Sequence, residues 1–489
     1  MEIKKTASLI PLCRLWKKGK ERGNLPALIC CAALLASACS FTEPLARPDM
    51  ALPEQWQEAA PATGAAMPSA DWWRGFGSLR LDALIAEAFA GNPDLRVQGE
   101  RVIQAELALR AANASLFPSL NLSGNSGRNR NDPGSNSAAA TSDRENSALN
   151  LAASYEVDLW GRVSADIASG KASLAASRHD YDGARLSLAA SVATAWFQYL
   201  ASVERLDIAR ENLAIAERVH KVVEARYRHG AVSALDLSRQ TTTVLTQRAQ
   251  IDPLEVQVRQ TRMALDILCG RTPSPAAAQD TDTLAGLSIP AIEAGLPSEL
   301  LLRRPDIASA ESRLDAAAAN VGAARAELFP RITLSAGGGL ATDVLLSLAH
   351  PSSVISLSAA LLQTVFDGGR LRAQVETARS QERELLETYR KTILAALKEV
   401  EDSLSNAARD TRQEEAHAQI LAEAERGLRL AELRYSTGAD DLLSVLDAQR
   451  TRFSVQDQLA QLRLARLTDA VNLFKALGGG WKRPEPDQP

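Results

Sequence analysis

The sequence predicts a mainly α-helical protein with a small β part, assembled from two copies of one structural unit. Three observations support this prediction. Short motifs recur in the same order in the two halves, each half holds two runs of alternating apolar and polar residues, and each half holds one long stretch with hardly a turn signal. The chain has 489 residues, 46% of them hydrophobic but only 4% aromatic. Such a composition suits long helices packed at close range.

Residues 1–38 read as a bacterial export signal. A basic head precedes an apolar run from Leu25 to Ala38. The run is too short for a membrane-spanning helix of about 20 residues, but it is typical of a signal peptide. The residues LASAC at 35–39 resemble the bacterial lipobox, in which cleavage precedes a cysteine that receives diacylglycerol. We therefore expect lipidation of Cys39 and, because Ser40 is not aspartate, sorting to the outer membrane. An ordinary signal peptide with an incidental cysteine is the alternative.

Charge and cysteine content exclude several classes of function. The full chain has a formal charge of −4, and loss of residues 1–38 removes seven basic and two acidic side chains, which leaves −9. This balance gives no basic footprint for nucleic acid. Of the five cysteines, three leave with the signal and Cys39 is expected to carry lipid. Only Cys269 remains, so no intrachain disulfide can form.

Four short motifs occur twice, in the same order and at nearly constant spacing. The first two pairs are NPDL (92–95) with RPDI (304–307) and ASLFPSL (114–120) with AELFPRI (326–332), each 212 residues apart. The other two pairs are LWGR (159–162) with DGGR (367–370) and RYRHG (226–230) with RYSTG (434–438), each 208 residues apart. The two halves are therefore repeats of one unit.

The repeats set the expected division of the chain. The segments are a signal at 1–38, a lipidated extended segment at 39–80, a first repeat at 81–269, a connector at 270–297, a second repeat at 298–477 and a disordered tail at 478–489. Each repeat begins with two helical stretches. In the first repeat these are Leu81–Ala90, stopped by Gly91-Asn92-Pro93, and Asp94–Leu116, which ends before Pro118 because proline disfavours helix in the preceding residue.

Two runs in each repeat alternate between apolar and polar residues, as strands with one buried face do. In the first repeat they are Leu120–Gly124 and Ser147–Trp160, joined by a polar loop, and they form an expected hairpin at 119–160. In the second repeat they are Ile332–Leu340 and Val354–Phe366, in an expected hairpin at 331–366. Strands of a soluble sandwich are one interpretation of these runs.

A membrane barrel is favoured over the sandwich. The runs are near the roughly 9 to 11 residues that a tilted spanning strand needs, and the chain is exported. Aromatic residues also stand at every junction of helix and strand, and they are predicted to form an interfacial belt. The belt residues are Phe117, Trp160, Phe329 and Phe366. Gly161 is expected to let the chain turn sharply from Trp160 into the next helix.

The number of strands requires more than one chain. Four strands cannot close a barrel, and an open sheet edge cannot lie in lipid. Two chains would supply eight strands, which close around an interior filled by side chains. A water-filled pore therefore needs three or more chains.

Long helices follow each hairpin. The stretches Val163–Arg228 and Leu371–Tyr435 contain almost no breaker, and each would span roughly 100 Å as a helix. Small and apolar residues recur in them at the three-and-four spacing of coiled coils. Turns at Gly230 and Gly438 lead into return helices, which completes helical hairpins at 163–268 and 371–476.

At this point the chain resembles the TolC/OprM family of outer-membrane efflux proteins, most closely its lipid-anchored, NodT-type branch. The resemblance rests on the LFP junctions at 116–118 and 328–330, DLWGR at 158–162, FDGGR at 366–370, RPDI at 304–307 and LDAQR at 446–450. It covers essentially all of the expected mature chain. It implies a homotrimer whose 12-strand barrel in the outer membrane continues into a helical coiled-coil barrel across the periplasm. It also implies a passive exit duct for small toxic compounds or drugs, without cofactor, that docks with a periplasmic adaptor and an inner-membrane transporter of the RND type.

The resemblance also implies a closed state that is pinched at the periplasmic tips. Leu443 and Asp447 match the apolar and acidic rings of that constriction, and Tyr435 and Arg434 match residues that tie neighbouring helices together. A solvated carboxylate on the helix surface is the alternative for Asp447, and Asp440 and Asp441 read as acids at a helix start. The tip residues expected to contact the adaptor are Gly230, Val232, Ser233, Gly438, Ala439 and Asp440.

Other classes of function fit less well. The five histidines are scattered without metal-ligand spacing, and the glycine runs lack the lysine and hydroxyl of a phosphate-binding loop. No enzyme is therefore expected. Two alternatives stay open: an exit duct for type I protein secretion or metal efflux, and a periplasmic coiled-coil scaffold or adaptor, which predicts no barrel strands.

Overall fold

The computed structural model describes residues 50–58, 69–131, 142–274, 282–292 and 294–484. The chain forms two compact units, each built from both repeats. The sheet unit takes in the described residues of Ser115–Ala165 and Gly322–Val375, and the helical unit takes in those of Leu45–Ala114, Asp166–Val321 and Glu376–Pro489. The expected signal and Cys39 lie outside the described residues.

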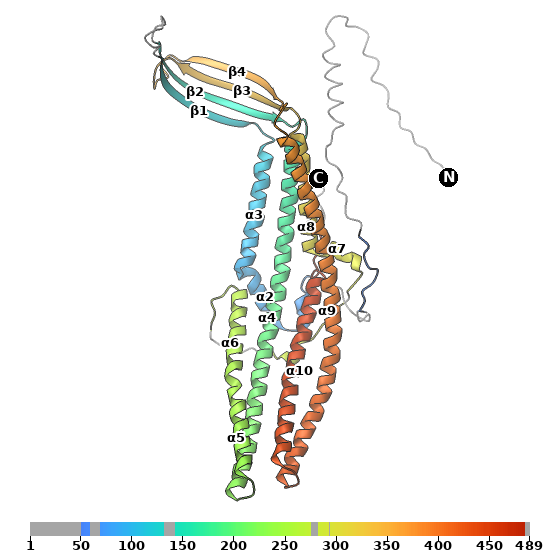
Figure 1. Cartoon of the computed structure of the whole chain (residues 1–489). Coiled ribbons are helices and arrows are strands. Elements are labelled where there is room, and N and C mark those ends of the chain that lie inside the picture. The colour runs from blue at the N-terminus through green and yellow to red at the C-terminus, as the bar shows by residue number, and fades with distance from the viewer. Residues whose placement is uncertain (1–49, 59–68, 132–141, 275–281, 293, 485–489) are drawn as a thin grey trace, which may run out of the picture. The chain divides into compact units, whose positions relative to one another are not determined.

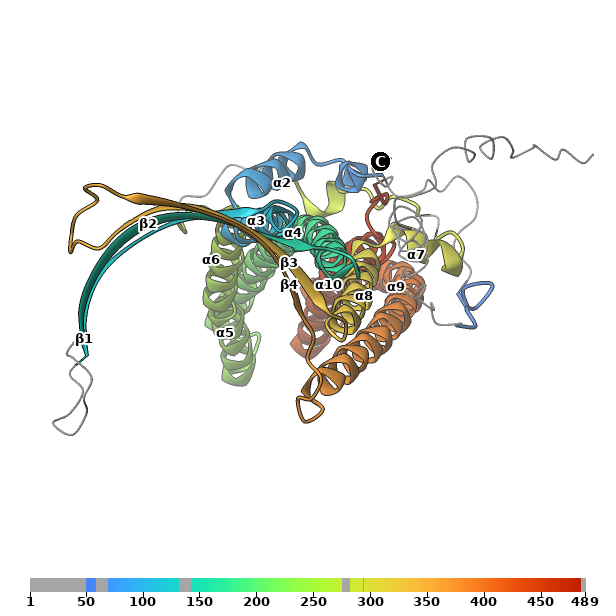
Figure 2. The ribbon, with the colours of Figure 1, turned by 90° about the horizontal axis from the view of Figure 1, so that it is seen from above.

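The sheet unit contains one antiparallel sheet of four strands in the order β1-β2-β3-β4 (Figure 1). The strands are β1 (Ser119–Asn131), β2 (Ser142–Val157), β3 (Arg331–Thr342) and β4 (Ser352–Leu362). Because β2 belongs to the first repeat and β3 to the second, the pairing of β2 with β3 joins the repeats. Seen from above, the sheet is strongly curved (Figure 2), as a segment of a barrel wall must be.

The strand bounds differ from those expected at both ends. β1 continues to Asn131, and β2 begins at Ser142, so both enter the stretch predicted as a polar loop. Cross-strand hydrogen bonds and the Arg128–Asp143 ion pair support this polar part, which apolar alternation could not reveal. At the helical end β2 stops at Val157 and β4 at Leu362, before Trp160 and Phe366.

The helical unit is formed by elements from before, between and after the two hairpins. In chain order they are η1 (Trp72–Phe76), α2 (Leu79–Gly91), α3 (Pro93–Ala114), α4 (Arg162–Arg228), α5 (Ala234–Ala249), α6 (Ile251–Leu268), η2 (Leu284–Gly286), η3 (Pro297–Glu299), α7 (Leu300–Arg303), α8 (Pro305–Ala326), α9 (Arg370–Ser436) and α10 (Leu442–Ala476). The first turns of α4 and α9 and the last turn of α8 belong to the sheet unit.

The two long helices have the expected extent. α4 and α9 contain 67 residues each, which gives roughly 100 Å at 1.5 Å per residue. By length and composition α4 alone among the described helices could cross a membrane, but 67% of its most apolar window is buried in the protein, as in a core helix. The return helix of the first repeat is divided at Gln250 into α5 and α6. Pro253 explains the break, because it has no N–H to donate to the carbonyl of Ala249.

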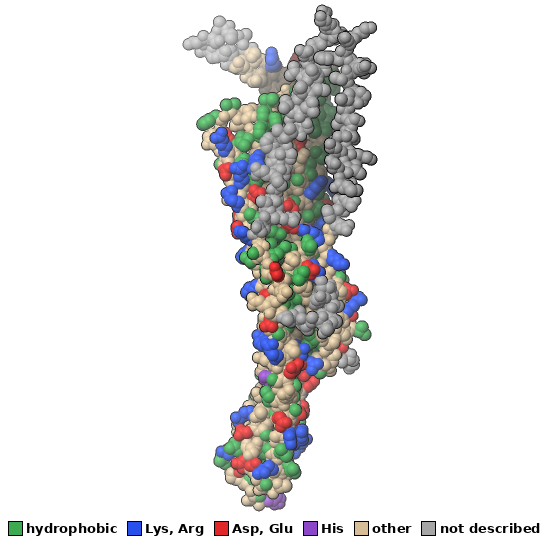
Figure 3. Space-filling model, turned by 90° about the vertical axis from the view of Figure 1, so that its right-hand side faces the viewer, with side chains coloured by type: hydrophobic (Ala, Val, Ile, Leu, Met, Phe, Trp, Pro, Cys, Tyr) green, Lys and Arg blue, Asp and Glu red, His purple; other side chains and the backbone are tan. Residues whose placement is uncertain are grey.

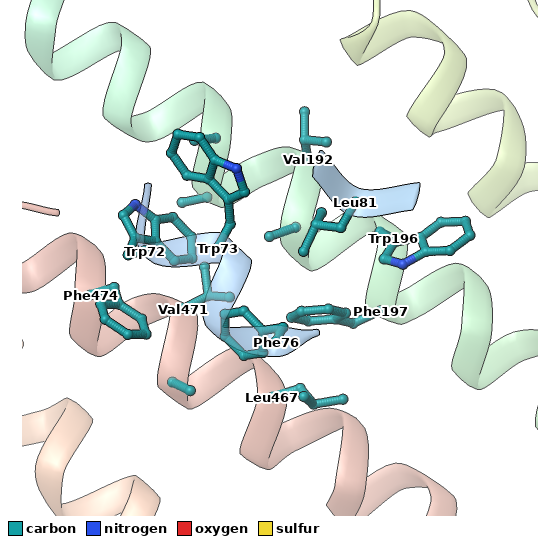
Figure 4. Packing of buried hydrophobic residues seen from close by; sticks show 14 of the residues in the cluster. Trp72, Trp73, Phe76, Leu81, Val192, Trp196, Phe197, Leu467, Val471 and Phe474 are labelled. Atoms are coloured by element: carbon teal, nitrogen blue, oxygen red, sulfur yellow. The ribbon is translucent and has the colours of Figure 1, made fainter. Parts of the chain in front are cut away.

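The main core lies where the two repeats meet in the helical unit. Figure 4 shows η1, α4 and α10 contributing aromatic rings to it. Trp72 stacks on Phe474 with 5.1 Å between ring centroids, and Phe76 lies 5.0 Å from Phe197. Residues 39–80 were predicted to be extended, yet Trp72, Trp73 and Phe76 are among the most buried side chains.

Part of the tail at 478–489, which was predicted to be disordered, is ordered in the structure. Residues 478–484 are held against the helical unit: the indole of Trp481 donates to Asp182 at 2.8 Å, and Arg483 pairs with Glu311. Gly478 has φ of 86°, and a Cβ there would come within 1.9 Å of the carbonyl oxygen of Arg303. Glycine is required at 478 because no side chain fits, so the start of the tail is packed into the helical unit.

Candidate functional site

The register of the sheet sorts its side chains by polarity. Leu122 lies opposite Leu151, Tyr155 opposite Leu334, and Ala336 opposite Leu357, so most large apolar positions of the four strands share one face, with Val354 and Leu362 of β4 on the other. Large apolar residues on this face are Leu120, Leu122, Leu149, Leu151, Leu334, Leu340, Ile355, Leu357 and Leu361. All nine are exposed, Ile355 to 89%. The face has the apolar, uncovered surface that a lipid-facing sheet needs.

The opposite face of the sheet is polar and mostly uncharged. Ser123 lies opposite Asn150, Ser154 opposite Ser335, and Ser335 opposite Ser358. Such a face suits contact with water. Together the two faces confirm the predicted alternation and fit a wall between lipid and a wet interior. The outer edges of β1 and β4 pair with no other strand among the described residues.

A compact junction connects strands and helices within the sheet unit. Gly161 has φ of 75°, which confirms the expected sharp turn before α4. Trp160 stacks on Phe329 with 5.0 Å between centroids, and its indole donates to the carbonyl of Pro330 at 2.8 Å. Phe117 and Phe366, in contrast, are 71% and 89% exposed. The structure thus brings together two of the four predicted belt residues, while the belt itself stays a prediction.

The two helical hairpins end in turns of the same geometry. Gly230 and Gly438 adopt φ of 69° and 78°. Ala231 N–H donates to Arg226 O at 2.9 Å, and Ala439 N–H donates to Arg434 O at 2.8 Å. This pattern satisfies the last carbonyls of α4 and α9 and requires the left-handed conformation that glycine adopts without strain.

Each turn is followed by a capped helix. Ser233 caps α5 in a reciprocal arrangement with Asp236, and Asp441 caps α10 by accepting from the backbone N–H of Ser444. Asp440 accepts from the backbone N–H of Asp441, from the Ser444 hydroxyl and from Arg434. These hydrogen bonds, the backbone one first, lower the pKa of Asp440. The expectation of helix-start acids therefore describes both residues.

Tyr435 and Arg434 were predicted to tie helices together at the constriction. Tyr435 is 6% exposed and packs with Val219, Val223, Leu442 and Val445 of both hairpins. The guanidinium of Arg226 lies 4.6 Å from the centroid of its ring. Arg434 instead bonds within its own turn, to Asp440 at 3.3 Å and to Ala439 O at 3.4 Å. In one chain, Tyr435 joins the hairpins and Arg434 stabilises the turn.

Leu443 and Asp447, predicted to line the constriction, lie on the surface of the single chain. Leu443 is 47% exposed. Asp447 contacts Arg450, one turn along α10, at 3.8 Å, and both side chains are well exposed. Neither side chain is buried among the described residues. Rings formed by several copies therefore stay a prediction.

A ladder of polar contacts between α4 and α10 was missed at the sequence level. Arg452 is 11% exposed and contacts Glu211 at 2.8 Å and Asn212 at 3.3 Å on α4, and it lies 3.9 Å from Glu425 on α9. Arg205 pairs with Asp457 at 2.6 Å. These contacts hold the second hairpin against the first. Spacing within one helix gives no signal for them, because the partners lie in different repeats.

Two carboxyl groups meet between α9 and α10, also unforeseen. Asp410 is 2% exposed and Asp469 is 9% exposed. Burial, and then the hydrogen bond with Asp410, raise the pKa of Asp469 to about 7, while Arg409 lowers the pKa of Asp410. The pair therefore shares a proton near neutral pH. In the first repeat, the positions 208 residues before Asp410 and Asp469 hold Ser202 and Thr261. A comparison of the two repeats could therefore have shown that this pair of acids occurs only in the second repeat.

The chain matches the family model for outer membrane efflux proteins over residues 84–271 and 296–479. It is a member of the outer membrane efflux protein family. The two matched segments follow the two repeats, and the resemblance drawn from the sequence is confirmed. The prediction of an outer-membrane efflux channel is thereby confirmed as well, and the interpretation as a periplasmic scaffold without barrel strands is wrong.

Named relatives of the family cover nearly the whole chain. The pyoverdine export outer membrane protein OpmQ of Pseudomonas aeruginosa is 40% identical over 92% of this chain and 96% of its own. The toluene efflux pump outer membrane protein TtgC of Pseudomonas putida is 34% identical over 92% and 94%. The cation efflux system protein CusC of Escherichia coli is 31% identical over 93% and 98%. A crystal structure of CusC superimposes with a TM-score of 0.81, at 29% identity, over 90% of this chain and all of that one.

Proposed function

We propose that three copies of this chain join edge to edge, β4 of one against β1 of the next, into a closed barrel of 12 strands. One observation supports this above all: the sheet has one lipid-compatible face, one wet face and two unpaired edges among its described strands. An edge in lipid leaves backbone groups without partners, so closure is the stable solution. Twelve strands enclose a wider interior than eight, which leaves room for water.

The barrel serves as the passive exit duct of a tripartite efflux pump. An inner-membrane transporter of the RND type supplies the driving force, and a periplasmic adaptor contacts the turns at Gly230 and Gly438. Cys39 carries the lipid anchor in the outer membrane. The relatives OpmQ and TtgC, named for pyoverdine export and toluene efflux, support small organic compounds as the cargo class. Metal cations are a second candidate, because CusC is named for cation efflux.

Closure occurs at the helical tips. Leu443 from three copies forms an apolar ring that blocks hydrated solutes, and Asp447 forms an acidic ring beside it. Both side chains are exposed in the single chain and so are available for such rings. Tyr435 holds the second hairpin against the first while the rings are closed.

Disulfide crosslinking across the unpaired edges tests the assembly. Asn121→Cys on β1 is combined with each of Ser356→Cys, Ser358→Cys and Ala360→Cys on β4, which lie on the same polar face as Asn121 and cover the neighbouring registers. We expect oxidised membranes to contain linked species of two and three chains for at least one combination. The pair Leu149→Cys and Leu357→Cys is the control. Since β2 is paired on both sides within the sheet, it cannot meet β4 of a neighbouring chain. A ladder that stops at two chains, or no ladder for any pair, contradicts the trimer.

A further inference from the structure

A cavity of about 600 Å³ lies in the helical unit beside the predicted constriction. It is bounded by α5 on one side and α10 on the other, with α4 as its floor, and we call it the α5–α10 cavity. Leu443, Leu446 and Phe453 of α10 line it together with Ile215 of α4. Leu443 therefore belongs both to the wall of this cavity and to the proposed constriction near the tip. Its volume falls in the range of sites for small organic ligands.

The charged groups of this lining have one sign. Arg239 on α5 and Arg450 on α10 line the α5–α10 cavity, and no acidic side chain is among its described lining residues. The chain as a whole carries a formal charge of −4. On the face of the helical unit seen in Figure 3, acidic and basic side chains are interspersed. Arg450 also contacts Asp447 at 3.8 Å, so Arg239 is the cation of the lining on which recognition of an anion rests.

The remaining polar groups of the lining are neutral and incompletely bonded. Gln449 is 9% exposed, and neither its amide nitrogen nor its amide oxygen has a hydrogen-bond partner among the described residues. The amide oxygens of Gln247 and Gln250 lack partners there as well. Buried polar groups are nearly always paired, so an amide left without a partner at a cavity wall indicates a site that a polar molecule completes.

Three threonine hydroxyl groups of α5 provide hydrogen-bond acceptors in the lining. Thr242, Thr243 and Thr246 donate their hydroxyl protons to carbonyls of α5 itself, at 2.8 to 3.1 Å. Their oxygens are left to accept hydrogen bonds from a ligand. The cavity therefore offers guanidinium and amide donors for an anionic group, threonine oxygens for hydroxyl or amide protons, and an apolar wall around Phe453.

We propose that the α5–α10 cavity is a binding site for small organic anions that carry hydroxyl or amide groups. It holds such solutes next to the constriction during export. The proposal deepens the proposed function and rests on it, since it takes the cavity to face the solute path.

Binding of carboxyfluorescein to the purified full chain in detergent, followed by fluorescence anisotropy, tests the site. The cation tetramethylrhodamine methyl ester serves as a probe of similar size. We expect carboxyfluorescein to bind and the cationic probe to bind at least tenfold more weakly. Arg239→Gln removes one charge-assisted hydrogen bond and should weaken carboxyfluorescein binding about tenfold. The matched control is Arg248→Gln, which removes the same charge from the same helix outside the lining, where Arg248 pairs with Glu217.

The outcomes distinguish failure of the binding site from failure of the exit duct. Equal binding by the Arg239 and Arg248 variants, equal binding of both probes, or no binding by wild-type protein that forms channels in planar bilayers would overturn the site and leave the duct standing. Protein that binds carboxyfluorescein but forms no channel would overturn the duct instead. Thermal unfolding of both variants verifies that they are folded.

Discussion

Arg226 lies over the ring of Tyr435, 4.6 Å from its centroid, and its guanidinium also donates to Ser436 O at 2.8 Å. The last turn of α4 is thereby joined to the last turn of α9. One residue comes from each repeat, and both stand in the duplicated motif at the tips, RYRHG and RYSTG. The same motif thus provides the cation in one copy and the aromatic ring in the other.

This contact predicts that the ring of Tyr435, and not its hydroxyl, keeps the hairpins together. The hydroxyl has no partner among the described residues. Tyr435→Phe should therefore conduct like the wild type in planar bilayers. Tyr435→Ala should raise single-channel conductance several-fold, because it removes the apolar packing of the ring and also its cation–π contact. The cation–π contact alone is worth about 1 kcal/mol. Equal conductance of the alanine and phenylalanine variants would show that the ring has no role in closure.

Leu443 and Asp447 provide a second prediction about closure. Both are exposed in the single chain, so truncation should cost little stability but should widen the constriction. Leu443→Ala and Asp447→Ala should each raise conductance clearly above a small wild-type value. Leu430→Ala on α9, also exposed, is the control and should change nothing. Unchanged conductance in both tip variants would place the constriction elsewhere.

The Asp410–Asp469 pair predicts a dependence of stability on pH. The pKa of Asp469 is raised from 3.8 to about 7, so the folded protein holds a proton that the unfolded chain releases. This contribution is fully present below the unfolded pKa and is lost as the pH rises through the folded pKa. The melting temperature of the wild type should fall by about 2 °C more between pH 6 and pH 8 than that of Asp469→Asn.

The matched control for this measurement is Asp457→Asn. It breaks the ion pair with Arg205 and should lower the melting temperature by a similar amount at both pH values. A pH slope that is the same in Asp469→Asn and in the wild type would mean that the pair does not share a proton in this range.

The glycines of the tail provide a fourth prediction. Gly478→Ala places a methyl group against the carbonyl of Arg303 at positive φ and should cost at least about 1–2 kcal/mol of unfolding free energy. Gly427, inside α9, has open space around its ideal Cβ, so Gly427→Ala should add about 0.5–1 kcal/mol. Urea unfolding of both variants provides the comparison. Equal effects would show that the tail is not part of the core.

Much of this fold could be predicted because its signals are local and occur twice. Turn glycines, the LFP junctions and long stretches without breakers marked both hairpins and both 67-residue helices. The contact of Arg452 with Glu211 could not be predicted, since no pattern in one sequence says which helix faces which. The burial of the aromatic residues of η1 was missed for a related reason. Five residues are too few to show a period, so Trp72 and Trp73 gave no sign of their burial.

The register of the sheet limits which insertions and deletions its strands can tolerate. Because successive side chains point to opposite faces, inserting or deleting one residue in β2 would turn Leu149 and Leu151 toward water and Asn150 toward lipid. Since β2 pairs with both β1 and β3, the shift would also misplace both neighbours. Insertions within β2 therefore keep its two faces only in steps of two residues, and a single added residue must be absorbed by a β-bulge or a loop.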